Sequence, residues 1–279
     1  MSFFKILRPY NCFFVVICVF FGAFYKNSLF NYSVLYAAIS AFLITGAGYI
    51  MNDFFDLTID IINKPNRVLP SGKMNPKTAY IYSVSLFLTG IIISFLTKNV
   101  YCVFIAVFNS LALFYYAKFY KMRFLSGNLI VSYAAASTFI FGGLCNNNFK
   151  NSLFIAIFAF LYTLIREFIK DAEDIEGDSK SGAHTLAIHF GRKKTVLVSI
   201  IPSLVIVLFI FYLFHLRFLY PNTFIFMNLF VSLPLIIFII YLINHSNDKG
   251  KFLKISSLMK VDMLILLIIL WMGNYENIQ

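Results

Sequence analysis

Nine of the 12 acidic residues fall in two short clusters, which cover residues 52–60 and 166–178 of the 279-residue chain. Within each cluster, three aspartates stand at positions i, i+3 and i+7, a spacing that aligns side chains along one face of a helix. Carboxylates stacked in this way repel one another, so the arrangement is unfavourable unless cations neutralise it. The six aspartates are Asp53, Asp56, Asp60, Asp171, Asp174 and Asp178.

The chemistry that fits these clusters is the binding of a divalent cation. Hard oxygen ligands suit Mg²⁺, which takes one or two carboxylates and completes its octahedron with water and phosphate oxygens. Solvated acidic loop residues are the alternative, but they do not explain a duplicated spacing in a chain with 12 acidic residues. The sequence therefore predicts a Mg²⁺ site with ligands drawn from Asn52, Asp53, Asp56, Asp60, Asp171, Asp174 and Asp178.

Basic residues near these clusters could hold an anionic ligand. Lys64 and Arg67 follow the first cluster, and Arg8, Lys118 and Lys121 occupy other polar segments. Each of them is explained equally well as a basic residue that orients a membrane-spanning helix. The residue types alone leave both roles open.

The elements that position these residues must lie in a membrane. The chain is 60% hydrophobic and 13% charged, with a mean hydropathy of +0.82, whereas soluble domains are about 45–50% apolar and about 25% charged. This composition excludes a soluble protein, a secreted disulfide scaffold, a disordered tail and a large extramembrane domain. The net charge of +11 therefore indicates membrane topology and contact with anionic lipids rather than a nucleic-acid partner, and nothing implies a protein partner.

Hydropathy divides the chain into nine apolar stretches bounded by charged or turn-forming residues. The first could be the core of a signal peptide, but no small-residue cleavage site follows it. We predict an all-α polytopic membrane protein with nine transmembrane helices in a single domain over residues 1–279. The stretches are Asn11 to Tyr25, Val34 to Met51, Ala79 to Leu96, Val100 to Tyr116, Asn128 to Leu144, Leu153 to Ile169, Lys194 to Leu213, Phe224 to Ile243 and Ser257 to Met272.

The distribution of Lys and Arg predicts the orientation of these spans. When the loops of nine spans are assigned alternately to two sides, one side holds 19 basic residues and the other holds four. Basic residues concentrate in cytoplasmic loops. The N-terminus and both acidic clusters are therefore expected on the cytoplasmic side, and the C-terminus outside.

The four cysteines, Cys12, Cys18, Cys102 and Cys145, contain no C-x-x-C pair. We expect them to be small buried apolar side chains. A disulfide between Cys102 and Cys145 on the outer side is the alternative.

Three motifs together resemble the UbiA superfamily of intramembrane prenyltransferases, over nearly the whole chain. The first opens the first span, and the other two contain the acidic clusters that follow the second and sixth spans. They read Arg8-Pro9-Tyr10-Asn11, then Asn52-Asp53-x-x-Asp56-x-x-x-Asp60-x-x-Asn63-x-Pro65-x-Arg67-x-x-Pro70-Ser71-Gly72, and Arg166-Glu167-x-x-Lys170-Asp171-x-Glu173-Asp174-x-x-Gly177-Asp178.

Within the superfamily, the opening motif and the second acidic motif are most similar to the digeranylgeranylglyceryl phosphate synthase branch. The resemblance implies Mg²⁺-dependent transfer of a geranylgeranyl group from an allylic diphosphate to geranylgeranylglyceryl phosphate, a step of ether-lipid synthesis. It also implies a UbiA-type helical bundle with both acidic motifs on the cytoplasmic side of the membrane, which is the plasma membrane if the organism is prokaryotic.

The resemblance further implies roles for individual residues. Mg²⁺ stabilises a departing diphosphate as a Lewis acid, so Asp53, Asp56, Asp171 and Asp174 are the expected catalytic residues. The expected anchors for a phosphate on the acceptor are Lys121, Arg123 and Lys170. The expected substrate-binding residues are Arg8, Asn11, Lys64, Arg67, Tyr115, Lys118, Lys121 and Lys170.

Other functions remain open at this stage. An aromatic acceptor, as in quinone or tocopherol-type synthesis, would suit the same motifs. A cation-coupled transporter could also carry carboxylates on two repeats, but its site is expected near the bilayer midplane, whereas these clusters lie at the ends of spans. The D-x-x-D-G-x-x-A-R run of CDP-alcohol phosphotransferases is absent from the sequence.

Overall fold

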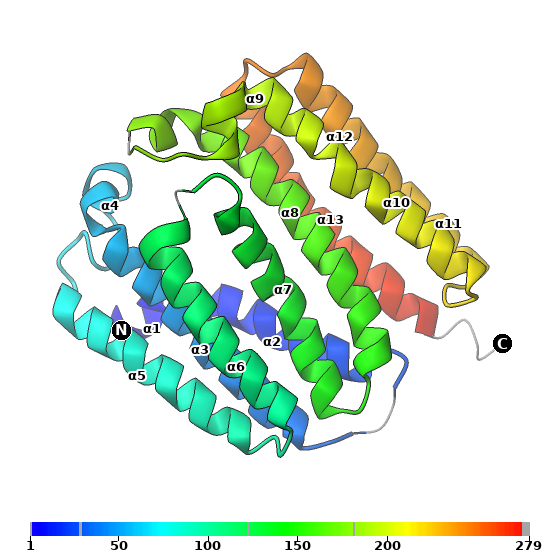
Figure 1. Cartoon of the computed structure of the whole chain (residues 1–279), viewed down its shortest axis with the longest axis horizontal. Coiled ribbons are helices and arrows are strands. Elements are labelled where there is room, and N and C mark those ends of the chain that lie inside the picture. Colours follow the sequence, from blue (N-terminus) through cyan, green and yellow to red (C-terminus); the bar gives the residue numbers. More distant parts are fainter. Residues whose placement is uncertain (1, 28–29, 122, 181, 275–279) are drawn as a thin grey trace. The chain divides into compact units, whose positions relative to one another are not determined.

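The computed structural model describes residues 2–27, 30–121, 123–180 and 182–274, and every regular element within them is a helix (Figure 1). The chain divides into two compact units. Unit 1 comprises Met1–Lys121 and Tyr133–Ile157, and unit 2 comprises Met122–Ser132 and Phe158–Gln279. Helices α7 and α8 therefore contribute residues to both units.

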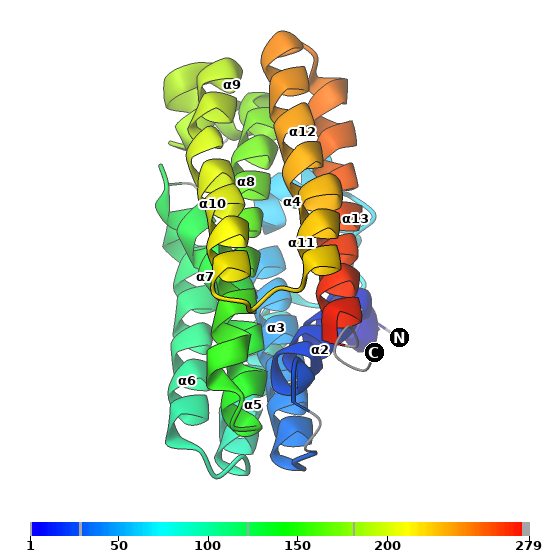
Figure 2. The same ribbon diagram turned by 90° about the vertical axis from the view of Figure 1, so that its right-hand side faces the viewer.

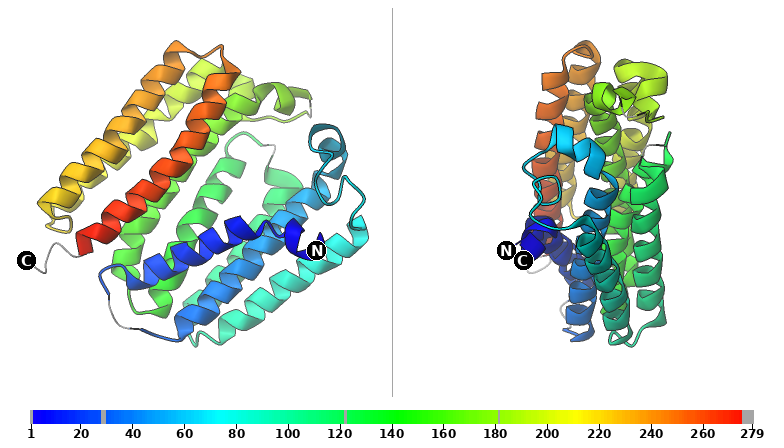
Figure 3. Two further views of the ribbon diagram at one scale, coloured as in Figure 1. Left: turned by 180° about the vertical axis from the view of Figure 1, so that it is seen from behind. Right: turned by 90° about the vertical axis from the view of Figure 1, so that its left-hand side faces the viewer.

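Unit 1 is built around α3, which packs against α2 on one side and α5 on another. In Figure 3 these helices are the blue and cyan ribbons that lie side by side. The elements of unit 1 are α1 (Ser2–Ile6), α2 (Pro9–Phe24), α3 (Ser33–Phe55), α4 (Leu57–Asn63), α5 (Pro76–Phe95), α6 (Val100–Tyr115), the π-helical turn η1 (Tyr116–Tyr120), and parts of α7 (Ser126–Cys145) and α8 (Phe149–Lys180).

Unit 2 contains the remaining parts of α7 and α8 together with the C-terminal helices. Figure 2 shows α10 to α13 running side by side. Its further elements are α9 (Leu186–Val198), α10 (Ile200–His215), α11 (Pro221–Met227), the π-helical turn η2 (Asn228–Ser232), α12 (Leu233–Asn244) and α13 (Lys249–Met272).

Every predicted apolar stretch falls on one or more of these helices, which confirms an all-helical, polytopic membrane fold. Within the described residues, eight helical segments are long and apolar enough to cross a membrane. The first predicted span corresponds to α2, which has only 16 residues, fewer than the about 20 that usually span a bilayer. The ninth crossing therefore stays a prediction.

Large apolar side chains cover the outside of both units. Ile92 and Phe104 in unit 1 are 66% and 68% exposed, and Ile201 in unit 2 is 67% exposed. Exposure of many such side chains is typical of surfaces that contact lipid rather than water. The four cysteines are free and buried as predicted, with the Sγ atoms of Cys102 and Cys145 3.1 Å apart.

A side-chain amide closes the end of α2, whose last carbonyl groups have no partner within the helix. The Nδ2 atom of Asn148 donates to the carbonyl oxygens of Gly22, Ala23 and Tyr25 over 3.1, 3.1 and 2.7 Å. These bonds tie α2 to the connection between α7 and α8 within unit 1. The helix that begins beside Arg8 is therefore held at its far end.

Two glycines allow α2 and α7 to approach closely. A Cβ atom added at Gly142 would lie 1.8 Å from the carbonyl oxygen of Val19, and one added at Gly22 would lie 2.0 Å from that of Phe139. Both obstacles are backbone atoms, which cannot rotate away. Small residues at such contacts are typical of packed membrane helices.

We therefore expect Gly142→Ala to destabilise the protein by about 1 to 3 kcal/mol, the usual cost of overpacking a core. The matched control is Gly177→Ala in α8, where nothing lies within 4 Å of the added Cβ atom and alanine favours the helix. Melting temperatures in detergent measure both effects. Equal melting temperatures for the two variants would show that α2 and α7 are not in close contact.

Candidate functional site

The first acidic cluster lies where α3 meets α4 in unit 1. Asp53 is in the last turn of α3, Asp60 is in α4, and Asp56 stands between the two helices with φ −84° and ψ 0°. The helix is interrupted at Asp56, so this trio stands on two successive helices rather than on one continuous helix. All three residues are nevertheless buried, with exposed fractions of 4%, 6% and 3% in chain order.

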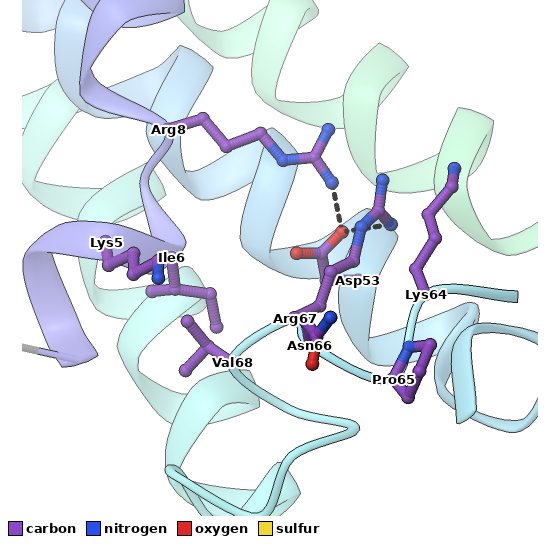
Figure 4. A pocket seen from close by; sticks show the side chains of 9 residues that line it. All are labelled: Lys5, Ile6, Arg8, Asp53, Lys64, Pro65, Asn66, Arg67 and Val68. Atoms are coloured by element: carbon purple, nitrogen blue, oxygen red, sulfur yellow. Dashed lines mark hydrogen bonds and ion pairs between the residues drawn. The ribbon is translucent and has the colours of Figure 1, made fainter. Parts of the chain in front are cut away.

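Two arginines neutralise the outer members of the trio. The guanidinium group of Arg8 donates to Asp53, and Nη1 of Arg67 lies 3.1 Å from Oδ1 of Asp53 and 2.5 Å from Oδ2 of Asp60. Figure 4 shows both guanidinium groups converging on the carboxylate of Asp53. A buried carboxylate is tolerated when it is paired and hydrogen-bonded in this way.

Asp56 has its own pair of partners. Its Oδ2 atom accepts a hydrogen bond from Nδ2 of Asn52 over 2.8 Å. The same atom forms an ion pair with Lys121. Lys121 directly follows the π-helical turn η1, whose wider turn changes the direction of the side chains after it. The lysine that the sequence assigned to an acceptor phosphate is thus paired with a predicted metal ligand.

The backbone of Arg8 is strained. It adopts φ 53° and ψ 64°, a left-handed conformation, immediately before Pro9 at the start of α2. The residue before proline is disfavoured in the α region, and a non-glycine residue with positive φ is uncommon. The guanidinium group also lies 4.9 Å from the ring centroid of Tyr49. Such strain concentrates at functional sites, where it can aim a side chain.

A pocket of about 400 Å³ opens beside these residues in unit 1. Four basic side chains, Lys5, Arg8, Lys64 and Arg67, line it together with the carboxylate of Asp53. Figure 4 places Lys5 on the short N-terminal helix and Lys64 and Arg67 on the segment after α4. Four cations and one carboxylate give the pocket an excess of positive charge that suits an anionic ligand.

The second acidic cluster lies on α8 in unit 2. Unlike the first trio, Asp171, Asp174 and Asp178 all lie within one continuous helix, as predicted. Asn128 of α7 is buried and donates from Nδ2 to Oδ2 of Asp171 over 2.8 Å. This hydrogen bond fixes the orientation of the carboxylate, which is how residues around a metal site tune its ligands.

One turn earlier on α8, a buried glutamate is paired with basic neighbours. Glu167 is 7% exposed, and its Oε1 atom accepts from Nη1 of Arg166 over 2.8 Å. Its Oε2 atom lies 4.0 Å from Nζ of Lys170. Charged residues thus extend from the end of α8 back into the membrane-spanning part of the helix.

Comparison with known proteins identifies the family. The UbiA prenyltransferase family matches residues 15–260. The chain belongs to this family. Digeranylgeranylglyceryl phosphate synthases of Methanosphaera stadtmanae and Sulfurisphaera tokodaii are each 36% identical to it, over 278 and 280 residues. These alignments cover 96% and 98% of this chain, and 97% and 98% of the relatives.

Solved structures share its fold. A structure reported for digeranylgeranylglyceryl phosphate synthase in membranes has a TM-score of 0.85 and 30% identity, covering 98% of this chain and 97% of that one. A UbiA homologue from Archaeoglobus fulgidus bound to GPP and Mg²⁺ has a TM-score of 0.68 and 15% identity, over 96% and 100% of the two chains. The protein is therefore an integral, multi-pass membrane prenyltransferase.

The carboxylates of this UbiA-family enzyme do not form a single compact cluster of metal ligands in the described part of the chain. Within the described residues, no group of three or more His, Cys, Asp or Glu side chains could hold a metal ion by itself. The oxygen donors still fit Mg²⁺, which needs only one or two carboxylates when phosphate and water supply the other ligands. Asp56 with the amide of Asn52 offers such a set in unit 1, and Asp171 with Asp174 does so in unit 2.

Three other predicted substrate-binding residues lie outside the lining of the basic pocket. Asn11 is exposed, Tyr115 is 46% exposed, and Nζ of Lys118 lies 4.8 Å from the ring centroid of Phe119. Conversely, Lys5 lines the pocket and was not among the predicted substrate-binding residues. Its position three residues before Arg8 was the available signal.

Proposed function

We propose that this enzyme transfers a geranylgeranyl group from its diphosphate to geranylgeranylglyceryl phosphate, a step of ether-lipid synthesis. The observation that carries the proposal is the 36% identity, over nearly the full length of both chains, to two digeranylgeranylglyceryl phosphate synthases. Membership of a prenyltransferase family argues against the alternative of a cation-coupled transporter. The basic pocket of unit 1 supports a substrate with an anionic headgroup.

In this proposal the aspartates act as Mg²⁺ ligands. Asp53 and Asp56 serve in unit 1, and Asp171 and Asp174 serve in unit 2, with Asn52, Asp60 and Asp178 as further oxygen donors. Bound Mg²⁺ supplies Lewis acidity that stabilises the charge on a departing diphosphate. A UbiA homologue that binds GPP and Mg²⁺ supports this cofactor.

In this proposal the basic residues bind the phosphate oxygens of the substrate. Arg8 and Arg67 already present guanidinium groups at the pocket, where they are paired with carboxylates. Lys5 and Lys64 line the same pocket and add positive charge. Charge-assisted hydrogen bonds from these groups stabilise the negative charge that develops as the carbon–oxygen bond breaks.

A membrane location suits both substrates. A prenyl chain loses about 0.8 kcal/mol for each CH₂ group drawn from an apolar environment into water. An enzyme whose outer faces are apolar can leave the chain in the bilayer and bind only the charged headgroup at the interface.

The acceptor is tested by direct competition. Purified enzyme with Mg²⁺ and labelled geranylgeranyl diphosphate receives geranylgeranylglyceryl phosphate together with 4-hydroxybenzoate, homogentisate and dihydroxynaphthoate. We expect the label in the ether lipid alone. Among these acceptors only geranylgeranylglyceryl phosphate carries a phosphate group that a cationic subsite could bind. Labelled aromatic products without an ether lipid would identify an aromatic prenyltransferase instead.

We also propose that the whole chain forms one nine-span domain with the N-terminus in the cytoplasm. In it, α2 crosses the membrane in addition to the eight longer segments. Support comes from the 19 to 4 division of basic residues between alternate loops. Single cysteines placed at Ser2, before α2, and at Asn274 should then label from opposite sides of the membrane. Labelling of both from one side would mean an even number of crossings between the N-terminus and the C-terminus.

A further inference from the structure

The polar face of α8 continues deeper into its span than the aspartate motif. Thr163, Arg166, Glu167 and Lys170 precede Asp171 at spacings that place all five on one face of the helix. All belong to unit 2 and to the candidate span Phe149–Ser179. Polar and charged residues within a span are costly and mark functional positions. Lys170 and Asp171 have expected roles in binding substrate and Mg²⁺, whereas Thr163, Arg166 and Glu167 do not.

Two buried polar atoms on this face have no hydrogen-bond partner within the described part of the chain. They are Oγ1 of Thr163, a residue that is 5% exposed, and Nε of Arg166. A buried helical hydroxyl usually donates to the carbonyl one turn earlier, as Ser203 does to Ser199 over 2.8 Å. Buried donors that lack a partner are rare, because each carries a desolvation penalty. A ligand would satisfy both atoms.

The charges on this face indicate what the ligand is. Arg166 and Lys170 share a single carboxylate, that of Glu167, at 2.8 and 4.0 Å. These three residues therefore carry an excess of one positive charge. Arginine binds phosphate through two parallel N–H groups, and its Nε atom belongs to one of these pairs. An arginine whose Nε is unpaired, beside a free hydroxyl and a lysine, suits a phosphate group.

We propose that Thr163, Arg166 and Lys170 form the subsite for the phosphate monoester of the lipid acceptor, an inference that rests on the proposed function. Lys121, the other lysine predicted for this role, is paired with Asp56. The subsite begins with Thr163, about 2.2 turns before Asp171 on the same helix. The free hydroxyl of a glyceryl phosphate is only a few bonds from its phosphorus atom. A phosphate held here would thus keep the nucleophile close to a residue assigned to Mg²⁺.

The test compares two acceptors, geranylgeranylglyceryl phosphate and its dephosphorylated form, geranylgeranylglycerol, with geranylgeranyl diphosphate as donor. Arg166→Gln should raise the KM for the phosphorylated acceptor about 10- to 100-fold, the value of a charge-assisted hydrogen bond. Thr163→Val, which keeps the side-chain volume, should raise it about fivefold. The KM for the donor and the rate with geranylgeranylglycerol should stay within about twofold of wild type, because neither of these substrates carries the acceptor phosphate.

The matched control is Arg217→Gln, which removes an exposed arginine from the connection between α10 and α11 and should change none of these values. Parallel losses with both acceptors would indicate a structural role and overturn the subsite. A raised KM for the donor alone would assign the residues to the diphosphate and overturn it as well. If the wild-type enzyme does not use the phosphorylated acceptor, the proposed function fails, and the subsite fails with it.

Discussion

Replacing Asp53 or Asp171 by asparagine is expected to lower the rate of prenyl transfer by about a thousandfold or more, equivalent to about 4 kcal/mol of transition-state stabilisation. Each change removes an anionic ligand of Mg²⁺, while the amide keeps the shape of the side chain. Asp171 would lose its charge but could still bond to Asn128, which donates to it in the native protein. Turnover with labelled geranylgeranyl diphosphate at saturating Mg²⁺ measures the effect.

The control for this pair is Asp248→Asn. Asp248 is exposed and caps α13 by accepting from the N–H of Gly250 over 2.9 Å, and asparagine caps helices equally well. The control should retain both turnover and melting temperature. Mg²⁺-dependent turnover near the wild-type rate in both Asp53→Asn and Asp171→Asn would show that the two clusters do not hold the catalytic ions.

The sequence predicted the positions of the helices well but not where they end. Hydropathy placed the second span at Val34 to Met51 and the sixth at Leu153 to Ile169, whereas α3 covers Ser33–Phe55 and α8 covers Phe149–Lys180. Backbone hydrogen bonds continue through polar residues, so the helices extend beyond the apolar stretches. For this reason Asp53 and the whole second trio are helical.

The pairing of charges could not be predicted from the sequence. Arg8 and Asp53 are separated by 45 residues, and Lys121 and Asp56 by 65, so only the packing of the helices brings them together. The sequence showed the right residue types near the first cluster, but it could not show that arginines and a lysine already neutralise the aspartates.

An isolated acid within a span was missed altogether. Asp262 lies in α13, is 5% exposed, and accepts a hydrogen bond from the hydroxyl group of Tyr162, 100 residues earlier. A lone aspartate in the apolar stretch Ser257 to Met272 was the signal. Asp262 has no neighbouring carboxylate in the sequence, so the spacing of acidic residues did not indicate it.

Arg67 is expected to contribute both to the stability of the fold and to the rate of prenyl transfer, and the two contributions can be separated. It is the cation that bridges Asp53 and Asp60, at 3.1 and 2.5 Å, and it also lines the basic pocket. Arg67→Gln leaves the buried carboxylate of Asp60 without this partner, and an uncompensated buried charge is strongly destabilising. We expect a lower melting temperature together with an about hundredfold lower rate of transfer, the effect of losing a charge-assisted contact to the diphosphate.

Asp60→Asn separates the two effects through a double-mutant cycle. In the Asp60→Asn background the only remaining buried carboxylate that contacts Arg67 is Asp53, which keeps Arg8 as a partner, so Arg67→Gln should lower the melting temperature much less. It should still lower turnover about a hundredfold relative to Asp60→Asn alone, because the pocket still lacks a guanidinium group for the departing diphosphate. If turnover of the double variant instead equals that of Asp60→Asn, Arg67 only neutralises the acidic cluster. The stabilisation of the leaving group would then fall to Arg8, Lys5 and Lys64.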